Sequence, residues 1–190
     1  MRLREEFGLY ANLRPVKTMV PGGRYEDIDL VLIRENIEGL YVAFEHFIPV
    51  GDDPHAVAIL RDKYPCGMPP HNPFRVRICA QPWPQKVTVV HKANVLKALT
   101  GLFLQAGREI AEEYEGRIAM DDRIVDACAM QLVMNPWQFD VIVTTNLFGD
   151  ILSDLMSGLV GGLGMAPGRQ CWREGSNFRG GARLGSGHRR

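Results

Sequence analysis

The sequence predicts an α/β protein, because short apolar runs typical of strands are interspersed with segments of helical periodicity. Residues 28–33, 87–90 and 140–145 are rich in Val and Ile, the pattern of buried strands. Residues 95–110, 124–134 and 151–159 repeat apolar side chains at helical spacing. Two of the strand runs lead directly into a helical segment, which is typical of α/β proteins.

Composition and charge indicate a soluble globular protein. The 190 residues fit one or two domains, with 46% hydrophobic residues, 23% charged residues and a net charge of zero. No apolar run is long enough to span a membrane, and residues 1–10 do not resemble a signal peptide. The four cysteines show no paired metal spacing and are interpreted as free thiols (Cys66, Cys79, Cys128, Cys171). We therefore expect a cytoplasmic protein with no membrane partner.

The first third of the chain contains a helix, an extended segment and a strand. Residues 2–10 place Leu3, Phe7 and Tyr10 on one side of a helix. Residues 11–21 are extended and end in the turn Pro21-Gly22-Gly23. The apolar strand at residues 28–33 follows this turn.

The middle of the chain contains a second strand and two helices. The strand at residues 87–90 precedes the helix at residues 95–110, so Lys92 lies on a strand-to-helix turn. Residues 112–114 end this helix, and residues 117–120 form a short strand. The helix at residues 124–134 stops before Pro136, since proline disrupts a helix interior.

The organising segment is residues 139–164. A buried strand at residues 140–145 is followed by a turn at residues 146–149, and Asp150 occupies the N-cap of the next helix. Asp150 and Asp154 are four residues apart, so both carboxylates lie on one helix face beyond the end of a strand, where α/β proteins bind ligands. Paired carboxylates suit Mg²⁺ or Mn²⁺. The spacing equally allows an N-cap Asp followed by a solvated Asp.

A long motif in this segment resembles a known family. N-L-F-G-D-I-L-S-D-L-M-S-G-L-V-G-G-L-G is similar to the metal-binding segment of the isocitrate and isopropylmalate dehydrogenases, which are NAD(P)-dependent and decarboxylating. The resemblance covers residues 3–60 and 86–168. It implies an incomplete form of that family's α/β fold, comprising the small domain and part of the large domain. This fold is not a Rossmann fold, and no G-x-G-x-x-G follows a strand here.

The resemblance assigns roles to nine residues. It implies that arginines clamp the substrate carboxylates, that a Tyr is an acid, that a Lys helps remove the hydroxyl proton, that an Asn contacts substrate or nicotinamide, and that three Asp bind the metal. Family members are homodimers with shared active sites, and the lysine and one aspartate come from the partner chain. The corresponding positions are Arg4, Arg14 and Arg34, then Tyr41, Lys92 and Asn94, and finally Asp126, Asp150 and Asp154. Without the resemblance, the sequence equally allows these arginines to be ordinary surface residues. It equally allows Tyr41 to be an aromatic side chain of a sheet.

The segment R-E-N-I-E-G-L-Y bears on the substrate. Isopropylmalate enzymes usually show T-G-G here, whereas Asn36, Glu38 and Gly39 resemble the isocitrate version. Ile37 departs from the usual Thr or Ser. The resemblance therefore implies oxidation of isocitrate to 2-oxoglutarate with NAD and Mg²⁺, most like the NAD-dependent isocitrate enzymes. Isopropylmalate and homoisocitrate remain the alternative substrates.

Two stretches do not fit the family. Residues 61–85 contain six Pro without periodicity, and residues 169–190 form a Gly-rich tail with six Arg and one Glu. For both, codons can be chosen so that reading one nucleotide later gives family-like sequence, and we interpret both as frameshifted, the tail being disordered. The resemblance also implies that the early part of the large domain is missing. Together these features predict a truncated chain without catalytic activity. The remaining rival, an RGG-like tail that binds RNA, is not favoured.

Overall fold

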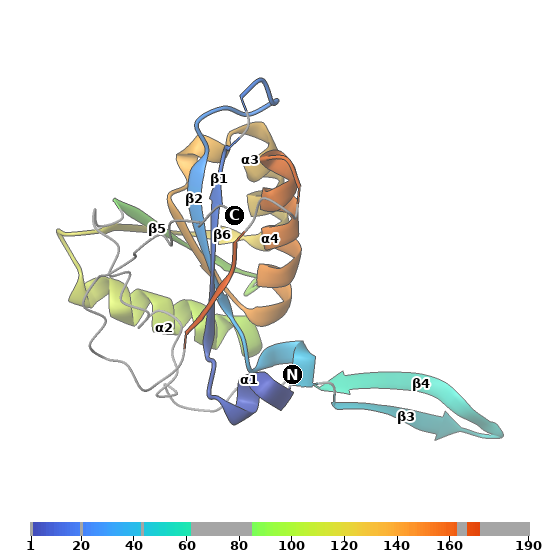
Figure 1. Ribbon diagram of the computed structural model, residues 1–190. Helices are drawn as coiled ribbons and strands as arrows, with labels where there is room; N and C mark the ends of the chain where they lie inside the picture. Colours follow the sequence, from blue (N-terminus) through green and yellow to red (C-terminus); the bar gives the residue numbers. More distant parts are fainter. Residues whose placement is uncertain (1, 20, 43, 62–84, 163–166, 172–190) are drawn as a thin grey trace.

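A six-stranded mixed sheet forms the centre of the protein (Figure 1). The computed structural model describes residues 2–19, 21–42, 44–61, 85–162 and 167–171. The strand order is β6-β5-β7-β2-β1-β8. Strands β6, β5, β7 and β2 are parallel, whereas β1 and β8 are antiparallel to their neighbours. The strands are β1 (Ala11–Lys17), β2 (Asp29–Glu35), β5 (Lys86–His91), β6 (Ala119–Ile124), β7 (Val141–Thr144) and β8 (Arg169–Cys171).

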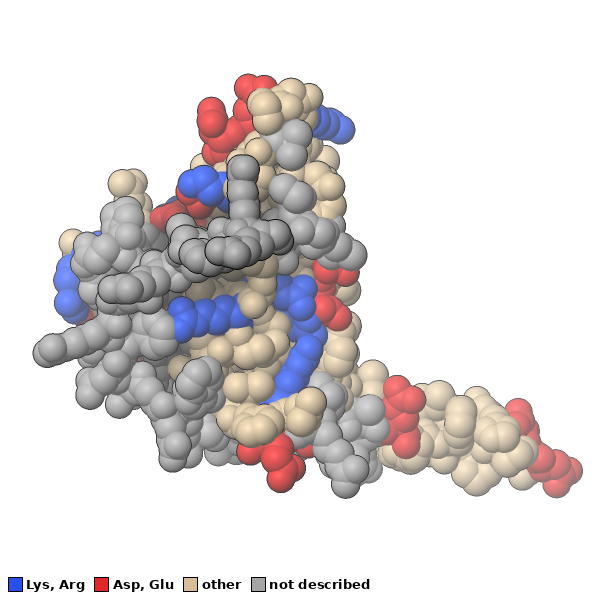
Figure 2. All heavy atoms as spheres, in the orientation of Figure 1, with Lys and Arg blue, Asp and Glu red and all other residues tan. Residues whose placement is uncertain are grey.

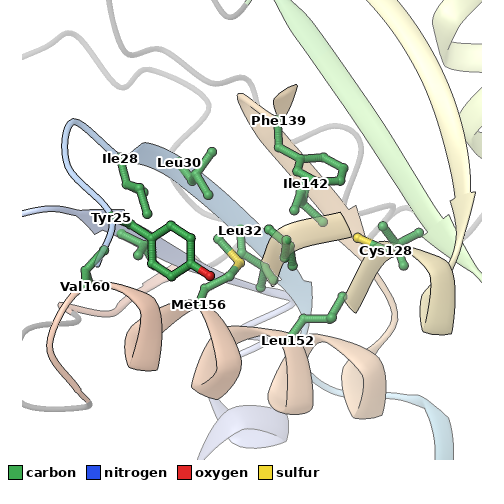
Figure 3. Packing of buried hydrophobic residues seen from close by; sticks show 13 residues of the cluster. Tyr25, Ile28, Leu30, Leu32, Cys128, Phe139, Ile142, Leu152, Met156 and Val160 are labelled. Atoms are coloured by element: carbon green, nitrogen blue, oxygen red, sulfur yellow. The ribbon is translucent and has the colours of Figure 1, made fainter. Parts of the chain in front are cut away.

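Helices cover both faces of this sheet. Helix α2 (Leu99–Glu113) lies on one face, and α3 (Val125–Met134) and α4 (Asn146–Leu159) lie on the other. The core under α3 and α4 includes Leu32, Ile142, Leu152 and Met156, all fully buried (Figure 3). Strands β5, β7 and β2 are covered on both sides, which explains why their sequences are nearly continuous apolar runs. The predicted α/β class is therefore confirmed.

Helix α4 begins five residues earlier than the sequence predicts. Residues 146–149 are its first turn, Thr145 is its N-cap, and the Gly149 amide donates to the Thr145 carbonyl. The predicted turn and the predicted N-cap at Asp150 are thus wrong. The reason is tertiary, because Asn146 is a poor helix former that is fully buried and bonded to other elements. Asp150 lies in the second turn, and Asp154 still follows it on the same face.

Other boundaries differ by a few residues. Helix α1 is shorter than predicted (Arg2–Glu6), and residues 92–98 form a turn before α2. Strand β6 covers Ala119–Ile124, instead of residues 117–120. Among the described residues, short 3₁₀ helices occur at Gly39–Val42 (η1) and Pro136–Gln138 (η3). The predicted strand positions for β2, β5 and β7 agree to within two residues.

A β-hairpin that the sequence did not indicate projects from the body of the molecule. Strands β3 (Phe44–Val50) and β4 (Asp53–Arg61) pair only with each other among the described strands. Figure 1 shows the pair extending away from the central sheet. Its exposed apolar side chains are Phe47, Ile48, Val50, Val57 and Leu60. A two-stranded hairpin of this kind is marginally stable alone, so its apolar surface indicates a further contact.

The two unusual stretches are only partly within the described residues. Arg169–Cys171 form β8 against β1, so the expectation of disorder from residue 169 onward does not hold for these three residues. Residues 62–84 and 172–190 lie outside the described residues, and the frameshift interpretation stays a prediction. Within the described segments, no helix is both long and apolar enough to cross a membrane.

Candidate active site

Arg34, at the end of β2, is the buried centre of the candidate site. Its Nε and Nη2 donate to Asn146 Oδ1 at 3.0 and 2.8 Å, and its Nη1 pairs with Asp150. Gly149 lies against the stem of the arginine, and a Cβ there would be 2.6 Å from Arg34 Cγ. Because no real Cβ approaches so closely, glycine is what allows α4 to pack on Arg34. Two turns of α4 thus fix the guanidinium.

Tyr41 lies beside this arginine on η1. Its hydroxyl donates a short hydrogen bond to Asp150 Oδ2, and its ring centroid is 5.1 Å from the Arg34 guanidinium carbon. Burial raises the pKa of Tyr41, and the hydrogen bond to the Asp150 carboxylate raises it further. The phenol therefore keeps its proton at neutral pH, as an acid must.

Two further arginines join the same site. Arg14 on β1 donates to Ser153 Oγ at 2.5 Å, and it lies 3.8 Å from Asp150 Oδ1 and 3.7 Å from Asp154 Oδ1. Burial lowers the pKa of Arg4, and the positive charge of Arg34 lowers it further. Figure 2 shows Lys and Arg side chains crossing this face of the molecule, with acidic side chains next to them over α4. Guanidinium groups gathered in this way favour an anionic ligand.

The carboxylates of α4 offer oxygen ligands at the edge of this basic group. The Asp150 and Asp154 side chains are 36% and 57% exposed, so a ligand can reach both. Burial alone would raise the pKa of Asp150, but the Tyr41 hydrogen bond and the charges of Arg34 and Arg14 lower it overall. Asp150 is thus ionised at neutral pH. Two carboxylate oxygen donors one helical turn apart fit a hard divalent cation in part.

The third predicted metal ligand lies elsewhere. Among the described residues, no group of three or more His, Cys, Asp and Glu side chains could hold a metal ion. Asp126, in the first turn of α3, instead bonds to Lys92 Nζ at 2.5 Å, and this hydrogen bond lowers the pKa of Asp126. The predicted residues therefore fall into two groups within one chain: the arginine, tyrosine and aspartate group around α4, and the Lys92–Asp126 pair.

The turn that carries Lys92 is firmly held. The Lys92 amide donates to Thr100 Oγ1 at 3.2 Å, and its carbonyl accepts from the amides of Val95 and Leu96 at 3.0 and 2.8 Å. His91 accepts the Ala93 amide on Nδ1. Asn94 is exposed on this turn, where a bound molecule can reach its amide.

Three site residues were not predicted from the sequence. Asn146 and Gly149 were placed in a turn, and Ser153 was read only as part of a motif. Asn146 is fully buried and donates to the Glu38 carbonyl at 2.9 Å while accepting from Arg34. The signal in the sequence for these residues is an amide side chain and a glycine next to an amphipathic helix, because such residues often make specific contacts at that position.

Comparison with known proteins gives this arrangement a family. The profile of the isocitrate/isopropylmalate dehydrogenases matches residues 1–178. The chain is 46% identical over 169 residues to the 3-isopropylmalate dehydrogenase of Methanothermobacter thermautotrophicus, which covers 88% of this chain and 49% of that protein. It is 49% identical over 170 residues to the isocitrate/homoisocitrate dehydrogenase of Thermus thermophilus, covering 87% of this chain and 48% of that protein.

A solved structure agrees with the sequence relatives. The crystal structure of isocitrate dehydrogenase from Methylococcus capsulatus superposes with a TM-score of 0.77 at 48% identity, covering 88% of this chain and 49% of that one. The chain thus spans about half the length of the relatives it matches. With the α/β sheet, the arginine group and the family profile in agreement, the chain belongs to the isocitrate/isopropylmalate dehydrogenase family.

Proposed function

We propose that this site serves the oxidation and decarboxylation of a 2-hydroxy acid that carries several carboxylates. The observation that carries the proposal is the convergence of Arg34, Arg14 and Tyr41 on Asp150. The guanidinium groups bind carboxylates, and the phenol lies where it can deliver a proton. The site thus combines recognition of a polyanion with acid catalysis.

The exposed carboxylates of Asp150 and Asp154 would hold a divalent metal ion, with Asp126 of a second copy as the third ligand. Bound there, Mg²⁺ or Mn²⁺ would supply a Lewis acid for the hydroxyl and carboxylate oxygens of the substrate. Arg14 lies between Asp150 and Asp154, so its charge would neutralise the substrate carboxylate that binds next to them.

Lys92 and Tyr41 handle the protons in this proposal. Lys92 Nζ would accept the proton of the substrate hydroxyl group, and NAD, when bound, would supply a hydride acceptor for the carbon that carries this hydroxyl group. After CO₂ leaves, Tyr41 gives the proton of its hydroxyl to the carbon that carried the lost carboxylate. The raised pKa of Tyr41, caused first by burial, keeps this proton in place until then. Asn94, exposed beside Lys92, contacts the substrate or the nicotinamide.

We propose isocitrate as the substrate, because Asn36, Glu38 and Gly39 follow the isocitrate version of their segment. Relatives with names of both kinds lie at similar identity, so identity does not separate the substrates. Calorimetric titration of the chain with isocitrate, isopropylmalate and homoisocitrate, each with and without Mg²⁺, tests the proposal. The tightest Mg²⁺-dependent binding should be to isocitrate. Tighter binding of either rival would overturn the substrate assignment, and no binding of any of them would overturn the function.

We further propose a homodimer with sites built from both chains. The Lys92–Asp126 pair does not join the Asp150 group within one chain, which a second copy would remedy. The β3–β4 hairpin gives such a copy a contact surface, because it projects from the body and exposes five large apolar side chains. A symmetric dimer would bury this surface and carry each Lys92 to the partner's Asp150.

A further inference from the structure

We infer that Asn146 is a positioning residue that sets the orientation of both Arg34 and Tyr41. The inference rests on the proposed function for its catalytic meaning, although its structural content can be tested alone. Asn146 is the first residue of α4 and has no exposed surface. It is not needed as a cap, because Thr145 occupies that position.

One side of the Asn146 amide holds Arg34. The oxygen accepts from both Nε and Nη2, so a neutral partner binds this edge of the guanidinium group. Nη1, at the other edge, is directed toward Asp150. The Gly149 approach to the arginine stem prevents the side chain from swinging away. Asn146 thereby determines which edge of Arg34 faces the carboxylates, and hence which edge a substrate carboxylate meets.

The other side of the same amide holds the segment that carries Tyr41. Asn146 Nδ2 donates to the Glu38 carbonyl at 2.9 Å, immediately before η1 begins at Gly39. Glu35 secures the same loop from the opposite end, since its carboxylate accepts the amides of Ile37 and Glu38. Because η1 is a single short turn, fixing its start fixes the phenol against Asp150.

Asn146 therefore joins three elements through one side chain: β2 through Arg34, η1 through Glu38, and α4 through its own backbone. An aliphatic residue could fill this volume but would leave Arg34 buried with two unpaired nitrogens. An aspartate could bind Arg34 but could not donate to the Glu38 carbonyl. Substitutions can therefore separate the binding of Arg34 from the hydrogen bond to the Glu38 carbonyl.

The test uses the full chain and two spectroscopic readouts. Solvent exchange of the Arg34 Nε–H, followed by ¹⁵N NMR, reports the first half. The ¹⁹F signal of fluorotyrosine at position 41, identified with Tyr41→Phe, reports the second half. Ser157→Ala is the matched control, because Ser157 is also buried on α4 but bonds to the Ser153 carbonyl, away from the amide of Asn146.

Asn146→Leu should accelerate the Arg34 exchange by about tenfold or more, the size expected for losing hydrogen bonds to a charged group, and should shift the Tyr41 signal. Asn146→Asp should preserve the Arg34 protection and shift only Tyr41. Ser157→Ala should change neither. If Asn146→Leu does not fold, Asn146→Asp decides alone. An unmoved Tyr41 signal in Asn146→Asp, or equal changes in Ser157→Ala, would overturn the inference.

Binding of isocitrate with Mg²⁺ provides the link to function. Asn146→Leu should weaken it by about tenfold or more, because the edge of Arg34 that meets the carboxylate is no longer fixed. If the unmodified chain binds no isocitrate, the proposed function fails, whereas the NMR readouts still decide whether Asn146 positions Arg34 and Tyr41.

Discussion

At the scale of single residues, the site depends on a buried arginine that is compensated from one helix. Arg34 is 1% exposed, and it is stabilised by a carboxylate and an amide that lie one turn apart on α4. A buried charge is costly unless it is paired and hydrogen-bonded, so every neighbour of Arg34 carries energetic weight. Two substitutions test this directly.

Gly149→Ala should destabilise the protein, because the added Cβ would lie 2.6 Å from Arg34 Cγ. Overpacking of this kind typically costs about 1–3 kcal/mol, which outweighs the roughly 1 kcal/mol that Ala gains over Gly in a helix. Gly158→Ala in the same helix is the control, since a Cβ there meets nothing within 4 Å. Urea unfolding should show a lower midpoint for Gly149→Ala and an unchanged or higher one for Gly158→Ala. Equal midpoints would contradict the close approach.

Asp150→Asn should destabilise the protein in a way that depends on pH. The pKa of Asp150 is lowered in the folded state, so ionised Asp150 stabilises the fold at pH values above its unfolded pKa. This contribution to stability is lost as the pH falls through the folded pKa. The variant should be less stable near pH 7, and the gap should close below about pH 4. Unfolding midpoints of both proteins across this range provide the measurement. A gap independent of pH would show that the Asp150 charge is not involved.

At the scale of elements, the hairpin and α4 have different supports. Helix α4 is held by the sheet through Leu152 and Met156, whereas β3 and β4 pair only with each other among the described strands. The hairpin nevertheless exposes large apolar side chains to water, which is energetically unfavourable. The proposed dimer would cover these side chains.

Ile48→Lys combined with Val57→Glu should abolish the proposed dimer. These residues face each other across the hairpin, so opposite charges preserve the strand pairing while removing apolar surface. Sedimentation equilibrium should give a dimer for the unmodified chain and a monomer for the double variant. Asp52→Asn, in the turn of the same hairpin, should remain dimeric. An unmodified chain that is monomeric at high concentration would contradict the proposal.

At the scale of the whole molecule, about half of the family's length is present, with both groups of predicted site residues. Residues 62–84 and 172–190 lie outside the described structure and carry the unusual composition.

We expect the chain as given to show no NAD reduction with isocitrate and Mg²⁺, and to be poorly soluble. Under the frameshift hypothesis, residues 61–85 replace a helix and residues 169–190 replace the loop that binds the cofactor's adenine. A chain with both stretches translated in the shifted frame should unfold at a higher temperature and bind NAD more tightly. Turnover together with cooperative unfolding of the unmodified chain would contradict this expectation, and the nucleotide sequence of the gene would test the hypothesis independently.

The sequence by itself determined the α/β class, the strands at β2, β5 and β7, and the shared helix face of Asp150 and Asp154. These features follow from local periodicity, which a single chain segment contains in full. Family resemblance, and not periodicity, supplied the roles of Arg4, Arg14, Arg34, Tyr41, Lys92, Asn94 and Asp126. The hairpin escaped prediction because its apolar side chains do not face the core of their own chain.

Only the tertiary structure decided where α4 begins and how the site is assembled. Local propensity favours a turn at Asn146–Gly149, yet these residues are helical because Asn146 bonds to Arg34 and Glu38, and because Gly149 packs against the arginine. These partners are more than 100 positions away along the chain. The tertiary structure likewise paired Lys92 with Asp126 instead of adding Asp126 to the Asp150 group. Such contacts depend on the packing of distant segments, which no local pattern encodes.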